Sequence, residues 1–63
     1  MVYQYYVAID TTGHAGLAAT KRCAVESEAL QHGDTVISVE ASNAFEARRQ
    51  AAAAWEQTSG TLH

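Results

Sequence analysis

The chain has 63 residues, enough for one small domain, and we expect residues 1–63 to form a single α+β domain. Four Lys and Arg side chains stand against seven Asp and Glu side chains, giving a net charge of −3 at pH 7. This balance argues against direct nucleic-acid binding, which depends on clustered excess positive charge. No apolar run is long enough to cross a membrane, and the first residues lack a signal-peptide pattern, so we expect a cytoplasmic protein.

The first predicted element is a strand over residues 2–10. Its odd-numbered residues from Tyr3 to Ile9 are all large and apolar, and successive side chains of a strand point to opposite faces. We therefore expect the odd-numbered face to meet the core and Tyr6 to lie on the other face. The segment Asp10–Gly16 contains two glycines and is predicted to be a turn.

The next segment is ambiguous, because its alanine content suits a helix while its larger side chains follow a period of two. Leu17, Cys23 and Val25 share one face in the period-two interpretation. We predict a strand over residues 17–26, antiparallel to the first, with Cys23 buried on its inner face. Residues 27–33 are then expected to form a loop or a single helical turn that ends at Gly33.

The last two elements have clearer patterns. Residues 34–41 alternate again and predict a third strand. Residues 42–58 are rich in alanine and predict a helix capped by Ser42 or Asn43, since Asn43 and Glu46 have capping-box spacing. The alanines on its inner face would let the helix approach the sheet closely, with Trp55 as the one large side chain.

Together these elements predict an α+β fold in the order βββα. A three-stranded antiparallel sheet would carry one C-terminal helix on one face. The opposite face of the sheet would stay uncovered, with Tyr6 exposed on it. An apolar open face and unpaired edge strands favour association with a partner or with a second copy of the chain.

The sequence shows no catalytic motif, and we expect neither enzymatic activity nor a bound cofactor or metal. His14, His32 and His63 match no metal-ligand spacing, so exposed loop histidines are the simpler interpretation. Cys23 is the only cysteine, which excludes an internal disulfide. Arg48 and Arg49 lie close to Glu46, and we expect solvated helix charges, with Arg49 paired to Glu46.

The candidate binding residues are acidic side chains near strand ends or on outward faces, together with one tyrosine. They are Tyr6, Asp10, Glu26, Glu28, Asp34 and Glu40. The acidic side chains would form a negative surface that pairs with Lys and Arg on a nucleic-acid-binding protein. Ordinary solvated charge is the alternative. Tyr6 would act as an aromatic anchor for a partner, or else cover the open face or pack in a homodimer.

The segment Ala41–Trp55 resembles the last helix of a double-stranded-RNA-binding domain, in which a Ser cap precedes a Glu-Ala pair and an alanine face. The matching residues are Ser42, Glu46, Ala47, Ala51 and Ala52. Asn43 and Ala44 stand where that family has phosphate-binding lysines. The resemblance therefore implies the shape of a helix and no RNA binding.

As a small acidic chain with one sheet and one helix, the protein also resembles the phage-encoded anti-CRISPR inhibitors. This resemblance implies a non-enzymatic inhibitor in a bacterial host cell, which occupies the DNA-binding or nuclease-recruiting surface of a CRISPR complex. Two alternatives stay open. One is a self-associating structural or regulatory module, and the other is weak nucleic-acid binding through Lys21, Arg22, Arg48 and Arg49.

Overall fold

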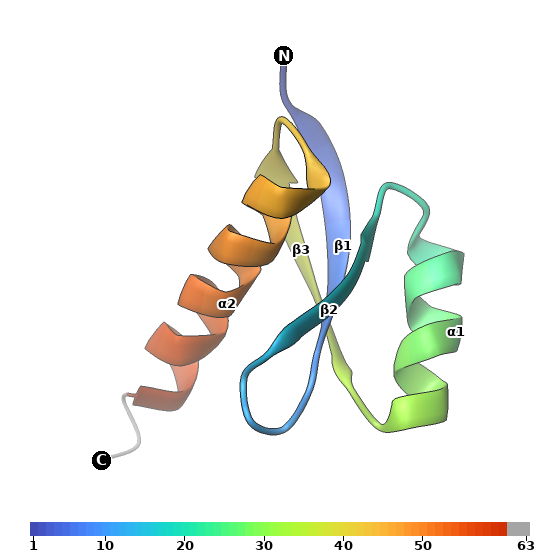
Figure 1. The fold of residues 1–63 in the computed structure, drawn as a ribbon, viewed down its shortest axis with the longest axis vertical. Helices are drawn as coiled ribbons and strands as arrows, with labels where there is room; N and C mark the ends of the chain where they lie inside the picture. Colours follow the sequence, from blue (N-terminus) through green and yellow to red (C-terminus); the bar gives the residue numbers. More distant parts are fainter. Residues whose placement is uncertain (61–63) are drawn as a thin grey trace.

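A computed structural model describes the backbone of residues 1–60 and the side chains of residues 1–57. Its elements are β1 (Tyr3–Ile9), β2 (Ala15–Ala19), α1 (Arg22–His32), β3 (Thr35–Ala41) and α2 (Ala44–Gly60) (Figure 1). The α+β class, the three-stranded antiparallel sheet and the C-terminal helix packed on it confirm the sequence prediction.

The segment 17–33 differs from the prediction. The second strand begins at Ala15 and ends at Ala19, and residues 22–32 form helix α1 where a strand and a single turn were expected. Most residues of this segment are good helix formers, and Val25 and Ala29 are buried one helical turn apart. The helix ends at Gly33, which adopts a left-handed conformation with φ of 70° and donates its N–H to Ala29 O.

The sheet has the order β2-β1-β3, with β1 in the centre and antiparallel to both neighbours. Pairing between β1 and β3 is continuous from Tyr3 opposite Ala41 to Ile9 opposite Thr35. Pairing between β1 and β2 is shorter and shifts register between positions 7 and 9. The two edge strands therefore run in the same direction, and α1 is the crossover that connects them.

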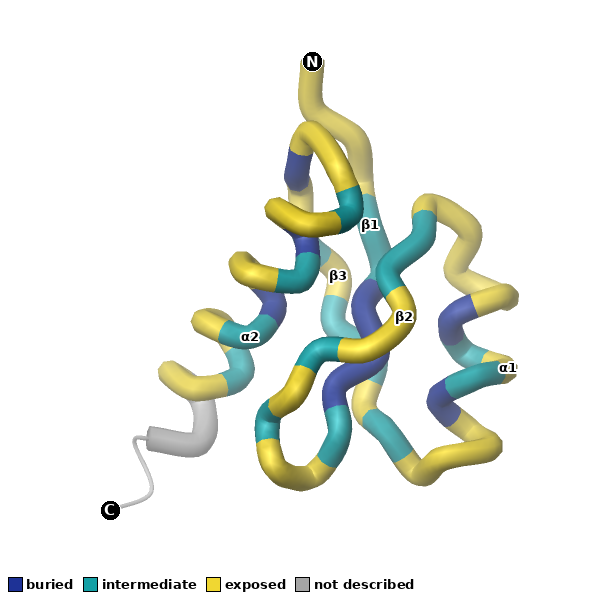
Figure 2. The backbone as a smooth tube through the Cα atoms, viewed as in Figure 1, coloured by how far each residue is buried: buried dark blue, intermediate teal, exposed yellow. Residues whose placement is uncertain are grey.

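The two helices pack against opposite faces of the sheet. On the odd-numbered face of β1, α2 packs on Val7 and Ile9. On the even-numbered face, α1 packs on Ala8 through Val25 and Ala29. Figure 2 shows the buried residues on β1 and on the inner sides of both helices. The face that was expected to be open is therefore covered by α1.

Small side chains let α2 lie close to the sheet, as its alanine content predicts. Ala47 and Ala51 are completely buried, while Trp55 packs at the edge of the same cluster. The cap of α2 is Asn43, because Glu46 N–H donates to Asn43 Oδ1 at 2.8 Å. This contact decides between the two cap residues that the sequence left open.

Candidate functional site

Tyr6 lies on the sheet face that α1 covers. Its side chain is half-buried and packs against the cluster formed by Ala8, Val25 and Ala29. The prediction of an exposed Tyr6 on an uncovered face is therefore wrong, because the segment that was interpreted as a strand is the helix that covers it. The part of Tyr6 that stays accessible lines a shallow depression beside Arg22.

Asp10 organises the turn between β1 and β2. Its Oδ1 accepts three hydrogen bonds, from Thr12 Oγ1 at 2.7 Å and from the backbone N–H groups of Thr12 and His14 at 2.9 Å each. Gly13 supplies the left-handed residue of this turn, with φ of 92°. The Thr12 hydroxyl and the His14 N–H hold the pKa of Asp10 below its ordinary value. This carboxylate is thus ionised and already held in the turn.

Three of the five predicted acidic residues meet at one end of the sheet, in what we call the acidic end. Asp10, Glu28 and Asp34 line an open depression of about 400 Å³, together with His32 and Leu17. They come from the residue after β1, the second half of α1 and the residue before β3. The C-terminal end of α1 points here, and its helix dipole adds partial negative charge. The Glu28 carboxylate contacts His32 Nε2 at 3.1 Å.

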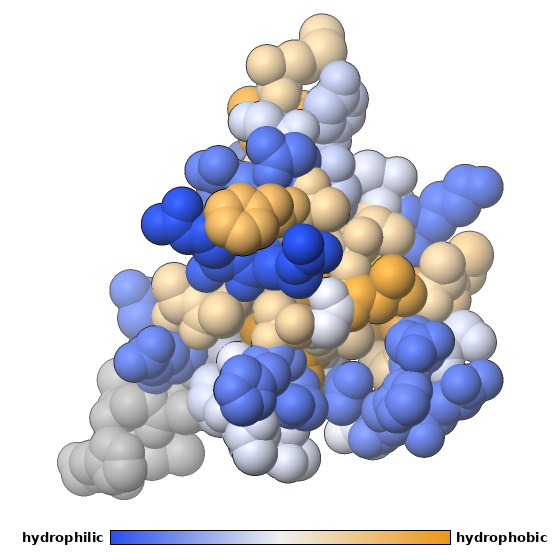
Figure 3. All heavy atoms as spheres, in the orientation of Figure 1, coloured by the Kyte–Doolittle hydropathy of each residue, from blue (hydrophilic) through white to orange (hydrophobic). Residues whose placement is uncertain are grey.

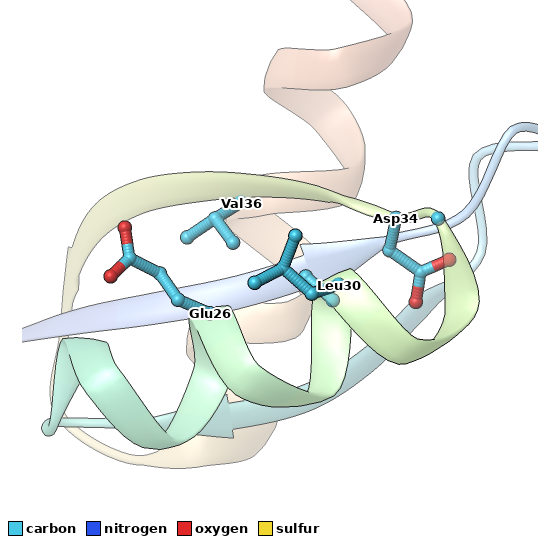
Figure 4. A pocket seen from close by; sticks show the side chains of 6 residues that line it. Glu26, Leu30, Asp34 and Val36 are labelled. Carbon is cyan, nitrogen blue, oxygen red and sulfur yellow. The ribbon is translucent and has the colours of Figure 1, made fainter.

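A second open groove, of about 490 Å³, lies between α1 and β3 and borders the acidic end. Figure 4 shows Leu30 between Glu26 and Asp34, with Val36 of β3 across from it. Leu30 is 85% exposed, although it is a large apolar side chain. Glu26 Oε2 also accepts from Arg22 Nε at 3.0 Å, an exposed pair within α1. The groove therefore combines apolar side chains, among them the buried Ala29 and the exposed Leu30, with carboxylates at both ends.

Glu40, the fifth acidic candidate, lies elsewhere. It is opposite Gln4 in the pairing of β1 with β3, near the end of β3 that is distant from Asp34. It shares the α1 side of β3 with Val36, because their positions differ by an even number. The structure therefore places Glu40 outside the acidic end but along the same edge strand.

Cys23 and the two described histidines, His14 and His32, belong to no cluster of metal-ligating side chains. Cys23 is exposed on α1, so the prediction that it is buried in a strand is wrong. His14 and His32 each face a single carboxylate, and no group of His, Cys, Asp and Glu within residues 1–60 could hold a metal ion. His63 lies outside the described residues. Among residues 1–60, no helix is long and apolar enough to cross a membrane.

The first turns of α2 carry an exposed aromatic side chain beside positive charge. Phe45 is 63% exposed, and Arg49 Cζ lies 6.0 Å from the centre of its ring. The expected ion pair between Arg49 and Glu46 is not formed among the described residues. Figure 3 shows apolar atoms over this part of α2, ringed by hydrophilic side chains.

The outer edge of β3 is a feature that the sequence did not reveal. β3 pairs with β1 on one side and has no strand on its other side within the described chain. Its side chains divide cleanly, with Glu40 and Val36 on the α1 side and the half-buried Ile37 and Val39 on the α2 side. Only the sheet order makes β3 an edge strand, and the sequence contains no signal for that order.

Comparison of the chain with known protein families, with curated proteins and with solved structures found no match. Its function is therefore inferred from the arrangement of charge and apolar surface. Within residues 1–60, that arrangement has two features that suit a partner. They are the acidic end and the groove that runs beside the β3 edge.

Proposed function

We propose that the chain is a non-enzymatic protein-binding module that occupies a basic, nucleic-acid-binding surface of a partner protein. The observation that carries this proposal is the convergence of Asp10, Glu28 and Asp34 at the acidic end. These carboxylates come from three separate segments, and the C-terminal end of α1 reinforces their negative field. A field of this sign attracts Lys and Arg side chains and opposes nucleic acid.

The partner class in this proposal is a CRISPR or similar nucleic-acid-binding defence complex in the bacterial cytoplasm, the target that the resemblance to phage-encoded inhibitors implies. Such a complex holds phosphate groups with Lys and Arg. Carboxylates offer these side chains charge-assisted hydrogen bonds of the same kind. The module would thus compete with nucleic acid for one surface, and it would bind less tightly as the salt concentration rises.

The experiment that tests this proposal compares two charge variants with equal net charge. The immobilised chain is exposed to bacterial lysate with and without nuclease treatment, and the bound proteins are identified by mass spectrometry. The double variant Glu28→Gln/Asp34→Asn removes two charges from the acidic end. The control Glu46→Gln/Glu56→Gln removes two exposed charges from α2, outside the acidic end. Asp10 is left intact because it holds the β1–β2 turn.

We expect the unmodified chain and the α2 control to retain a nucleic-acid-binding complex after nuclease treatment. The acidic-end variant should retain it about tenfold less well, since loss of charge-assisted contacts costs at least one factor of ten in affinity. Equal retention by both variants would overturn the proposal. Recovery only of species that disappear with nuclease would favour nucleic-acid binding instead.

A further inference from the structure

The β3 edge carries one charged side chain, Glu40, but otherwise lacks the devices that normally protect an edge strand. Natural edge strands are short, bulged, or carry Pro or Lys, because unpaired backbone groups recruit other strands. β3 runs for seven residues, pairs with β1 without a register shift, and contains neither Pro nor Lys. The opposite edge strand β2 is shorter, and its pairing is irregular. The outer backbone of β3 is therefore suited to accept an additional strand.

The two sides of this edge have different chemistry. On the α2 side, Ile37 and Val39 are half-buried and would lose further apolar surface to an added strand. On the α1 side, Glu40 lies on the strand itself, and Glu26 and Asp34 flank the adjoining groove. An added strand would therefore place one row of side chains against apolar surface and the other row against carboxylates.

A second copy of the chain is a poor occupant for this edge. In an antiparallel pair of β3 strands centred on Ser38, position 36 of one copy would face position 40 of the other. In such a pair the α1 sides of both copies lie on the same face of the joined sheet. Glu40 of each copy would then lie close to the groove of the other copy, which Glu26 and Asp34 flank. Like charges placed opposite one another destabilise strand pairing.

We propose that β3 binds an extended segment of a partner protein by strand addition, and that this segment carries Lys or Arg on one face and β-branched residues on the other. The basic face would lie on the α1 side, with its aliphatic stems over Leu30 and Val36. The β-branched face would lie over Ile37 and Val39. Backbone hydrogen bonds supply affinity in this mode, and the alternating side chains supply specificity. The inference rests on the proposed function, since the same negative surface selects the basic partner.

The test is a titration of the full-length, ¹⁵N-labelled chain with a capped heptapeptide of sequence Lys-Val-Lys-Val-Lys-Val-Lys. A second peptide carries N-methyl groups on every backbone nitrogen, which removes the hydrogen-bond donors of both edges but keeps every side-chain charge. A third peptide has Glu in place of Lys. Sedimentation of the chain without peptide measures its self-association.

We expect the first peptide to shift the amide signals of residues 35–41 and to slow their hydrogen exchange. The N-methylated peptide should bind about tenfold more weakly, because it cannot form the added ladder. The variant Leu30→Glu should keep its fold, since this side chain is exposed. It adds a carboxylate beside the groove and should therefore bind the first peptide several-fold more tightly at low salt, with the gain lost at 1 M salt.

Each contrary outcome has a distinct meaning. Equal binding of the first and the N-methylated peptide would overturn strand addition while leaving the charge-based function intact. Equal binding of the Lys and Glu peptides would overturn both. A dimer in the absence of peptide, with protected amides in residues 35–41, would make a second copy the occupant and overturn the assignment to a basic partner.

Discussion

Gly13 lies directly against the ring of Trp55, so that the β1–β2 turn and the C-terminal half of α2 are in contact. A Cβ added at position 13 would lie 2.8 Å from Cζ3 and 3.0 Å from Cε3 of Trp55. The same glycine has a φ of 92°, a conformation that L side chains rarely adopt. Trp55 is the one large side chain on the inner face of α2, and its packing therefore requires that position 13 has no side chain. The two residues are more than 40 positions apart in the sequence.

This contact predicts that Gly13→Ala destabilises the fold. The strained φ and the overlap with Trp55 together should lower the free energy of unfolding by about 2–4 kcal/mol. Gly33→Ala is the matched control, because Gly33 also has a positive φ but an added Cβ there meets nothing within 4 Å. It should cost only about 1 kcal/mol. Urea denaturation measures both, and equal losses would contradict the role of the Trp55 contact.

The Asp10 turn predicts a dependence of stability on pH. The Thr12 hydroxyl and then the His14 N–H lower the pKa of Asp10 from 3.8 in the folded chain. The ionised carboxylate therefore stabilises the fold above pH 3.8, and this contribution disappears as the pH falls through the lower, folded value. Thr12→Ala removes the strongest donor and should raise the pKa of Asp10, measured by following its carboxyl carbon by NMR. An unchanged pKa would show that the backbone donors alone hold the carboxylate.

Sequence patterns predicted β1 and β3 because apolar residues recur at every second position of each, and they placed the cap of α2 at Ser42 or Asn43, of which the structure shows Asn43. They failed between positions 17 and 33, where alanine fits either period and the inner face of α1 consists of only Val25 and Ala29. Missing α1 also gave the wrong exposure for Tyr6. The carboxylates of the acidic end come together only because of the order in which the strands and α1 are arranged. Local sequence patterns do not predict that order.

Exposure of Cys23 on α1 predicts rapid labelling of the native chain. Its thiol should react with a maleimide about as fast as in the urea-unfolded chain, because no packing shields it. A strand with Cys23 on its inner face would instead protect the thiol. The control is the double variant Cys23→Ala/Val25→Cys, which moves the thiol to a fully buried position of the same helix. Its labelling should become limited by unfolding, and equally fast labelling of both proteins would contradict the placement of α1.

The carboxylate of Asp34 should cost stability, because it opposes the dipole of α1. Asp34 follows the C-terminal end of α1, whereas Glu46 lies in the first turn of α2, where negative charge is favourable. Asp34→Asn should therefore raise the free energy of unfolding by about 0.3–0.5 kcal/mol at low salt, and Glu46→Gln should lower it by about the same amount. Both differences should shrink at 1 M salt, where the screening length falls to about 3 Å. Thermal unfolding at two salt concentrations measures them. If Asp34→Asn instead lowered the free energy of unfolding, the Asp34 carboxylate would stabilise the fold. Its position at the acidic end would then be explained without a binding partner.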